Sequence, residues 1–165
     1  MKRILLTGMS GTGKSTLITE LASRGYWAVD ADCDEYSEWV TVDSDSDAAG
    51  TPVETNRDWV WREDRIQALL SKKNKATLFL SGCASNMGNF LSQFDHVVLL
   101  SAPTQVIVER LEKRTTSAYG KNPQEVSRIL GLIEEVEPLL RRVADIEINT
   151  NVPIENVLMA LTNLP

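Results

Sequence analysis

Cysteine and histidine are rare in this sequence. Among its 165 residues, only Cys33 and Cys83 are cysteines, and only His96 is a histidine. The two cysteines lie far apart and form no C-x-x-C pattern, which excludes a disulfide framework and favours reduced thiols inside a cell. His96 starts an apolar run and has no partner pattern, so we interpret it as structural.

Long apolar runs and an excess of positive charge are also missing. No run approaches the roughly 20 residues of a membrane span, and the apolar stretch after the basic start ends at Leu6, too short for a signal peptide. The 17 Lys and Arg are outnumbered by 23 Asp and Glu, giving a net charge of −6, which disfavours nucleic acid as a partner. We therefore expect a soluble, cytoplasmic protein that binds neither nucleic acid nor a membrane.

The sequence does contain strands and helices in alternating order. Apolar residues make up 42% and charged residues 24%, and the length suits one domain over residues 1–165. Short apolar runs predict strands at about 4–7, 27–29, 77–80, 96–100 and 144–148. Helical spacing predicts helices at about 14–23, 103–114, 122–140 and 153–161, and one after the acidic loop 41–55 that carries Trp59, Ile66, Leu69 and Leu70 on one face. This alternation predicts a three-layer α/β/α fold with a five-stranded parallel sheet.

The loop after the first strand carries the clearest chemical motif, G-x-x-x-x-G-K-[ST]. Its glycines let the backbone turn N–H groups inward as a nest for an anion, and the following helix adds its positive end. Lys14 can reach the β- and γ-phosphates of a nucleotide, and the Ser15 hydroxyl is suited to Mg²⁺. The motif predicts an ATP and ADP site made of Gly8, Met9, Ser10, Gly11, Thr12, Gly13, Lys14, Ser15 and Thr16.

Two carboxylates stand at the end of the second strand. Asp30 and Asp32 are two positions apart and therefore point the same way, toward the phosphate edge of the sheet. One could hold a magnesium-bound water while the other accepts a proton from an attacking hydroxyl. The alternative is a helix cap for the residues from Glu35 onward.

Two arginines lie four positions apart on the helix predicted after the fourth strand. Arginines on a mobile segment neutralise charge on a transferring phosphoryl group and exclude water as they close. We therefore predict a lid over about 113–123, with Arg114 catalytic and Arg110 at the nucleotide. The alternative is a solvated helical face on which Glu109 and Glu112 are ordinary partners.

The region over about 34–70 is expected to bind the acceptor. Arg57 and Arg62 lie on the helix predicted after the acidic loop, where they could clamp an anion bidentately or form surface pairs. Gly82 and Cys83 follow the third strand at the same edge, where small residues let a ligand approach the backbone. Cys83 has no nearby base and is not expected to act as a nucleophile.

These features resemble one known family. The P-loop on the first strand, Val29-Asp30-Ala31-Asp32 after the second, Leu80-Ser81-Gly82 after the third and a late arginine-bearing lid are similar to shikimate and gluconate kinases, a branch of the nucleoside monophosphate kinase-like fold. The resemblance implies that Asp30 supports Mg²⁺ through water and that Asp32 meets the acceptor hydroxyl.

The acceptor half of the site departs from the shikimate kinase pattern. The glycine triplet that lines the shikimate site is here Gly82-Cys83-Ala84, and the R-x-x-E pair reads Arg62 followed by Arg65. Shikimate itself is therefore not predicted as the substrate.

Taken together, the sequence predicts a magnesium-dependent kinase, monomeric or homodimeric, that transfers the γ-phosphoryl group of ATP to a hydroxyl of a small molecule. A nucleoside monophosphate kinase is the close alternative, since its acceptor is a phosphate. A nucleotide-binding regulator that hydrolyses ATP slowly is another. A GTPase is disfavoured, because Ser101-Ala102-Pro103-Thr104 stands where N-K-x-D would follow the fourth strand.

Overall fold

A five-stranded parallel sheet organises the protein. The computed structural model describes residues 1–42, 56–73, 76–115 and 121–165, so most of the acidic loop and the middle of the predicted lid lie outside the described residues. The sheet order is β2-β5-β1-β6-β7. In that order the strands are Trp27–Asp30, Leu78–Ser81, Arg3–Thr7, His96–Ser101 and Ile146–Asn149. All neighbours pair in parallel, which confirms the predicted sheet.

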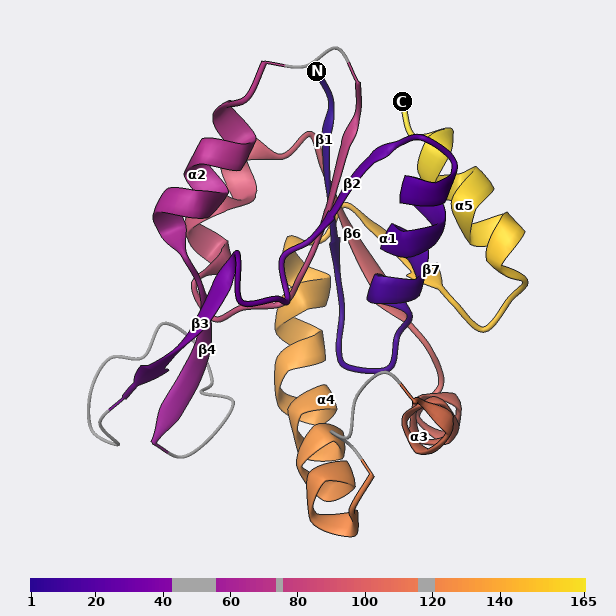
Figure 1. Cartoon of the computed structure of the whole chain (residues 1–165). Coiled ribbons are helices and arrows are strands. Elements are labelled where there is room, and N and C mark those ends of the chain that lie inside the picture. The colour runs from indigo at the N-terminus through magenta and orange to yellow at the C-terminus, as the bar shows by residue number, and fades with distance from the viewer. Residues whose placement is uncertain (43–55, 74–75, 116–120) are drawn as a thin grey trace.

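Helices cover both faces of this sheet (Figure 1). Helices α1 (Lys14–Ser23) and α5 (Ile154–Thr162) lie on one face. Helix α2 (Glu63–Ser71), the 3₁₀ helix η1 (Met87–Gln93) and the long α4 (Pro123–Val143) lie on the other. Helix α3 (Thr104–Lys113) packs at the end of the sheet where the strands finish. The predicted three-layer α/β/α fold is confirmed.

Successive side chains of the central strand β1 point to opposite faces of the sheet, and each face has its own apolar core. Ile4 and Leu6 face α1 and α5, whereas Leu5 faces α2, η1 and α4. All three side chains are essentially fully buried. The loop that follows β1 is therefore attached to the central strand of the sheet, which has apolar layers on both faces.

A two-stranded antiparallel sheet replaces part of the helix predicted after the acidic loop. Strands β3 (Ser37–Thr41) and β4 (Arg57–Trp61) pair with Trp39 opposite Trp59. The prediction that Arg57 and Trp59 lie on a helix is therefore wrong, and Arg62 is the residue just before α2. The aromatic and β-branched sequence around Trp59 favours a strand, but its partner lies across the acidic loop with no short hairpin signal between them.

The start of α4 follows the sequence prediction closely. The side chain of Asn122 accepts a hydrogen bond of 2.8 Å from the backbone N–H of Glu125, and Pro123 stands in the first turn. This N-cap fixes where the helix begins after the predicted lid. Within the part of the chain described, no helix has the length and apolar character needed to cross a membrane.

Candidate phosphotransfer site

The loop between β1 and α1 is shaped by glycine. Gly8, Gly11 and Gly13 have φ angles of +149°, +82° and +99°. A Cβ on Gly8 would lie 2.4 Å from the carbonyl oxygen of Leu100 on the neighbouring strand, so only glycine fits there. The sheet order reverses at β1, and in open parallel sheets ligands bind at that reversal.

No side chain among the described residues bonds to the free backbone amides in the first turn of α1. Gly13 is the N-cap, and the first turn contains no acidic residue. The unpaired N–H groups and the positive end of the helix dipole therefore favour an anion at this point.

Lys14 is folded over this loop. Its Nζ donates hydrogen bonds of 2.7 Å to the carbonyl oxygen of Gly8 and of 3.1 Å to that of Met9. The Thr12 hydroxyl donates to the same Met9 carbonyl at 2.8 Å. The ammonium group is thus held beside the helix N-terminus, where a polyphosphate chain would receive both the charge and the amides.

Asp30 accepts three hydrogen bonds at the end of β2. The Ser15 hydroxyl donates to its Oδ2 at 2.7 Å, while the Ser81 hydroxyl and the backbone N–H of Asp32 donate to its Oδ1 at 3.1 and 3.0 Å. Hydrogen bonds to the Asp30 carboxylate therefore link α1 and β5 to the end of β2.

The oxygen atoms of Ser15 and Asp30 fit a hard divalent cation such as Mg²⁺. No group of three or more His, Cys, Asp or Glu side chains with metal-binding geometry occurs in the described ranges of the chain. A cation here would therefore depend on few protein ligands and on phosphate oxygens, as Mg²⁺ in nucleotide sites does.

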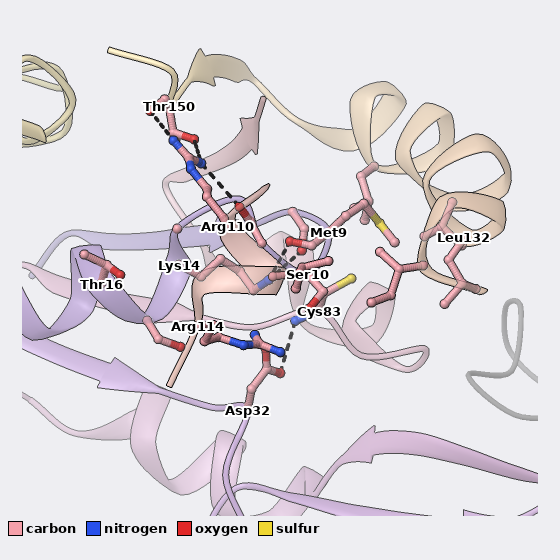
Figure 2. A pocket seen from close by; sticks show the side chains of 18 of the residues that line it. Met9, Ser10, Lys14, Thr16, Asp32, Cys83, Arg110, Arg114, Leu132 and Thr150 are labelled. Atoms are coloured by element: carbon pink, nitrogen blue, oxygen red, sulfur yellow. Dashed lines mark hydrogen bonds between the residues drawn. The ribbon is translucent and has the colours of Figure 1, made fainter. Parts of the chain in front are cut away.

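Asp32 faces the pocket that contains Lys14 (Figure 2). Its Oδ1 lies 3.4 Å from the backbone N–H of Cys83, which donates to it. Water reaches this side chain through the wide pocket, yet the surrounding walls desolvate the carboxylate and raise its pKa above the ordinary aspartate value. The charge of nearby Lys14 opposes that rise, and Asp30 adds to it.

Gly82 and Cys83, both predicted to bind the acceptor, lie differently. Cys83 lines the pocket, and burial raises the pKa of its thiol, which keeps it protonated at neutral pH. Gly82 packs closely against the buried Trp61. A Cβ added at this position would lie 3.0 Å from the indole ring, so a larger residue would crowd it. The backbone N–H of Gly82 donates to the Leu6 carbonyl at 3.1 Å, which continues the pairing of β5 with β1.

The predicted arginines divide into two groups. Arg114, at the C-terminal cap of α3, and Arg57, on β4, line the pocket with Asp32. The Arg57 guanidinium lies 4.0 Å from the centre of the Trp39 ring. Arg62 instead donates to Glu38 at 2.9 Å and to the carbonyl oxygen of Asp34 at 3.1 Å, which ties α2 to β3.

Arg110 also lines this pocket, and it contacts the protein itself. Its guanidinium donates to the carbonyl oxygen of Gly11 at 3.3 Å, to the Thr150 hydroxyl at 2.9 Å and to the Thr150 carbonyl at 2.8 Å. Sequence reasoning missed Thr150, and it also missed Trp39 and Trp59 as pocket walls. The position of Thr150 at the end of the fifth strand was the available signal, since all strands of a parallel sheet end at the same edge.

A phosphate cradle at the reversal of a parallel sheet, with a lysine folded over it, defines the class of P-loop nucleotide-binding proteins. The chain belongs to the family described as "AAA domain", whose match covers residues 4–131. No curated protein matches the chain.

Several solved structures share the whole architecture. A shikimate kinase from Acinetobacter baumannii in complex with shikimate is 21% identical, with a TM-score of 0.65 over 98% of this chain and 91% of its own. A shikimate kinase from Aquifex aeolicus is 19% identical, with a TM-score of 0.61 over 97% and 94%. A gluconokinase from Sinorhizobium meliloti is 16% identical, with a TM-score of 0.56 over 96% and 87%. The predicted resemblance is thus confirmed at the level of the fold, which is that of P-loop small-molecule kinases.

Proposed function

We propose that this protein is an ATP-dependent phosphotransferase that moves the γ-phosphoryl group of ATP to a hydroxyl group of a small molecule. The observation that carries the proposal is the position of Asp32, a carboxylate of raised pKa, in the same pocket as Lys14 and the glycine-rich loop. A base beside a phosphate cradle serves a reaction in which the acceptor loses a proton.

The loop from Gly8 to Thr16 supplies the nucleotide half of the site. Backbone amides and the N-terminus of α1 hold the phosphates, and Lys14 exchanges its bonds to the loop carbonyls for bonds to the β- and γ-phosphates. Arg114, which lines the same pocket, stabilises the charge that spreads over the transferring group.

Mg²⁺ is the metal that this site suits, with Ser15 as the direct ligand and Asp30 as the group that orients it. When bound, the ion neutralises charge on the β- and γ-phosphates. The 2.7 Å hydrogen bond between Ser15 and Asp30 fixes the hydroxyl oxygen with its remaining lone pairs turned away from the carboxylate.

The acceptor half centres on Asp32. As the acceptor oxygen forms its bond to the γ-phosphorus, the bond between that phosphorus and the bridging oxygen of ADP breaks, and the acceptor proton passes to the Asp32 carboxylate. Arg57, which lines the pocket beside Trp39, is suited to an anionic group on the acceptor. Whether Gly82 or Arg62 also serves the acceptor stays a prediction.

A nucleoside monophosphate kinase is the alternative in which the acceptor is itself a phosphate. That reaction needs no general base, so it gives no function to the Asp32 carboxylate with its raised pKa. A regulator that hydrolyses ATP slowly would use the phosphate cradle alone. The proposed hydroxyl acceptor accounts for both parts of the pocket.

A screen of phosphoryl transfer from ATP and Mg²⁺ to sugars, sugar acids, nucleosides and nucleoside monophosphates tests the proposal. We expect transfer to a hydroxyl compound and a loss of at least about 100-fold in Lys14→Ala, because a charge that acts on the transferring group is removed. Lys72→Ala, which removes an exposed lysine after α2, is the matched control. Equal rates in Lys14→Ala and the wild type, with both folded, would contradict the proposal.

A further inference from the structure

Thr150 joins three segments that are distant in sequence. It follows β7 directly and is buried, with 8% of its surface exposed. Its backbone N–H donates to the carbonyl oxygen of Ser101 at 2.8 Å, which continues the pairing of β7 with β6. Its hydroxyl donates to the carbonyl oxygen of Thr12 at 2.8 Å, so the end of the sheet is tied to the glycine-rich loop.

The hydroxyl of Thr150 is also an acceptor. It carries a single proton, and the contact to the Thr12 carbonyl is shorter than the 3.3 Å contact to the Ser101 carbonyl. Arg110 donates to the hydroxyl oxygen at 2.9 Å (Figure 2). A chain of bonds therefore runs from the guanidinium through the hydroxyl to Thr12, and the positive charge at its start strengthens each bond.

These contacts fix the direction of two peptide groups in the loop. In a planar trans peptide the N–H points opposite to the preceding carbonyl. With the Thr12 carbonyl held by Thr150, the N–H of Gly13 is turned to the other side. Arg110 holds the Gly11 carbonyl at 3.3 Å, and the N–H of the same peptide group, that of Thr12, donates to the Met9 carbonyl at 3.3 Å, which fixes the turn of the loop before Gly13. Gly13 is the N-cap of α1, where the orphan amides gather.

We propose that Thr150 and Arg110 are positioning residues that brace the outer side of the phosphate loop and orient its amides toward the phosphates. Their role is to act on the ligand through the backbone of Gly11, Thr12 and Gly13. The direct nucleotide contact of Arg110 stays a separate prediction, and the proposal rests on the proposed function, since it assumes a phosphate ligand in the loop.

Calorimetric binding of magnesium pyrophosphate and of ADP with Mg²⁺ tests this brace. Thr150→Val keeps the side-chain volume and removes the hydroxyl, and we expect about tenfold weaker binding of both ligands from one lost charge-assisted bond. Thr150→Ser restores the hydroxyl and should restore binding. Thr162→Val is the control, because that hydroxyl also bonds to a backbone carbonyl, that of Leu158, on α5.

Arg110→Met provides the second, independent variant. It should weaken pyrophosphate and ADP by the same factor, and the double variant with Thr150→Val should lose little more than either single one, because both act through one unit. Weaker ADP binding with unchanged pyrophosphate binding in Arg110→Met would mean that Arg110 contacts the nucleoside, and would overturn the proposal. Unchanged binding in folded Thr150→Val would overturn it as well. A wild-type protein that binds neither ligand would instead contradict the proposed function.

Discussion

The Ser15 hydroxyl donates a 2.7 Å hydrogen bond to Oδ2 of Asp30, across the gap between α1 and β2. Both groups belong to the proposed magnesium site, so the bond orients a metal ligand from outside the coordination sphere. Outer partners of this kind commonly change metal affinity by about 10- to 100-fold.

Asp30→Ala is therefore expected to raise the Mg²⁺ concentration needed for half-maximal ATP binding by about 10- to 100-fold. Calorimetric titration of ATP at a series of Mg²⁺ concentrations measures this shift. Asp64→Ala, which removes an exposed carboxylate from α2, is the control for lost negative charge. The same Mg²⁺ dependence in Asp30→Ala and the wild type would argue against a metal site at this carboxylate.

The raised pKa of Asp32 has a consequence for the reaction. The carboxylate accepts a proton only when ionised, so transfer should fall as the pH drops through a pKa that lies above the ordinary aspartate value of 3.8. Asp32→Asn should lower kcat by about 100- to 10,000-fold and remove this acidic limb. A pH profile with the acceptor found in the screen measures both. Nearly normal turnover in Asp32→Asn would favour the monophosphate kinase alternative.

The same pKa shift predicts a cost in stability. A carboxyl group whose pKa is higher in the folded state destabilises the fold when ionised, and the penalty grows as the pH rises from the unfolded value of about 3.8 through the folded value. Asp32→Asn should therefore melt at a higher temperature than the wild type at pH 7, with the difference vanishing near pH 4. Thermal unfolding over this pH range checks the sign. A lower melting temperature for Asp32→Asn at pH 7 would contradict the desolvation of the carboxylate by the pocket walls.

Gly8 and Gly131 offer a matched pair of glycine substitutions. Gly8→Ala places a Cβ 2.4 Å from a backbone oxygen at a φ of +149°, so we expect a loss of about 1–3 kcal/mol and of nucleotide binding. Gly131 lies inside α4, and apart from its chain neighbours and the backbone of α4 no described atom lies within 4 Å of a Cβ built there, so Gly131→Ala should stabilise the protein by about 0.5–1 kcal/mol. Denaturant unfolding and ADP binding measure both. A Gly8→Ala variant that binds ADP normally would refute the close approach at Leu100.

Residues close in sequence allowed the nucleotide half of the site to be predicted. The strand before Gly8, the glycines and the helix from Lys14 are contiguous, so one motif specifies the element, its conformation and its chemistry. The N-cap at Asn122 is equally local. The alternation of short apolar runs and helical periods predicted the fold, and the parallel pairing of the five strands confirms it.

The acceptor half depends on contacts between distant segments, and there the sequence was less informative. Trp39 and Trp59 pair across the acidic loop, so the periodicity near Trp59 was misinterpreted as helical. The nucleotide half contains one such distant contact as well, since Thr150 reaches Thr12 because β7 ends beside the phosphate loop. The place of Thr150 after the fifth strand puts it at that edge of the sheet, but its bond to Thr12 depends on the strand order, which no local pattern specifies.

The two halves of the pocket are attached to different parts of the sheet. The phosphate loop follows the middle strand β1, whereas Asp32 follows β2, the outermost strand, and Arg57 belongs to a separate pair of strands. If the protein acts as proposed, substitutions around this edge strand can alter the acceptor pocket while the interior of the sheet, and with it the phosphate loop, stays intact. The unequal attachment would then let the acceptor change while the nucleotide stays the same.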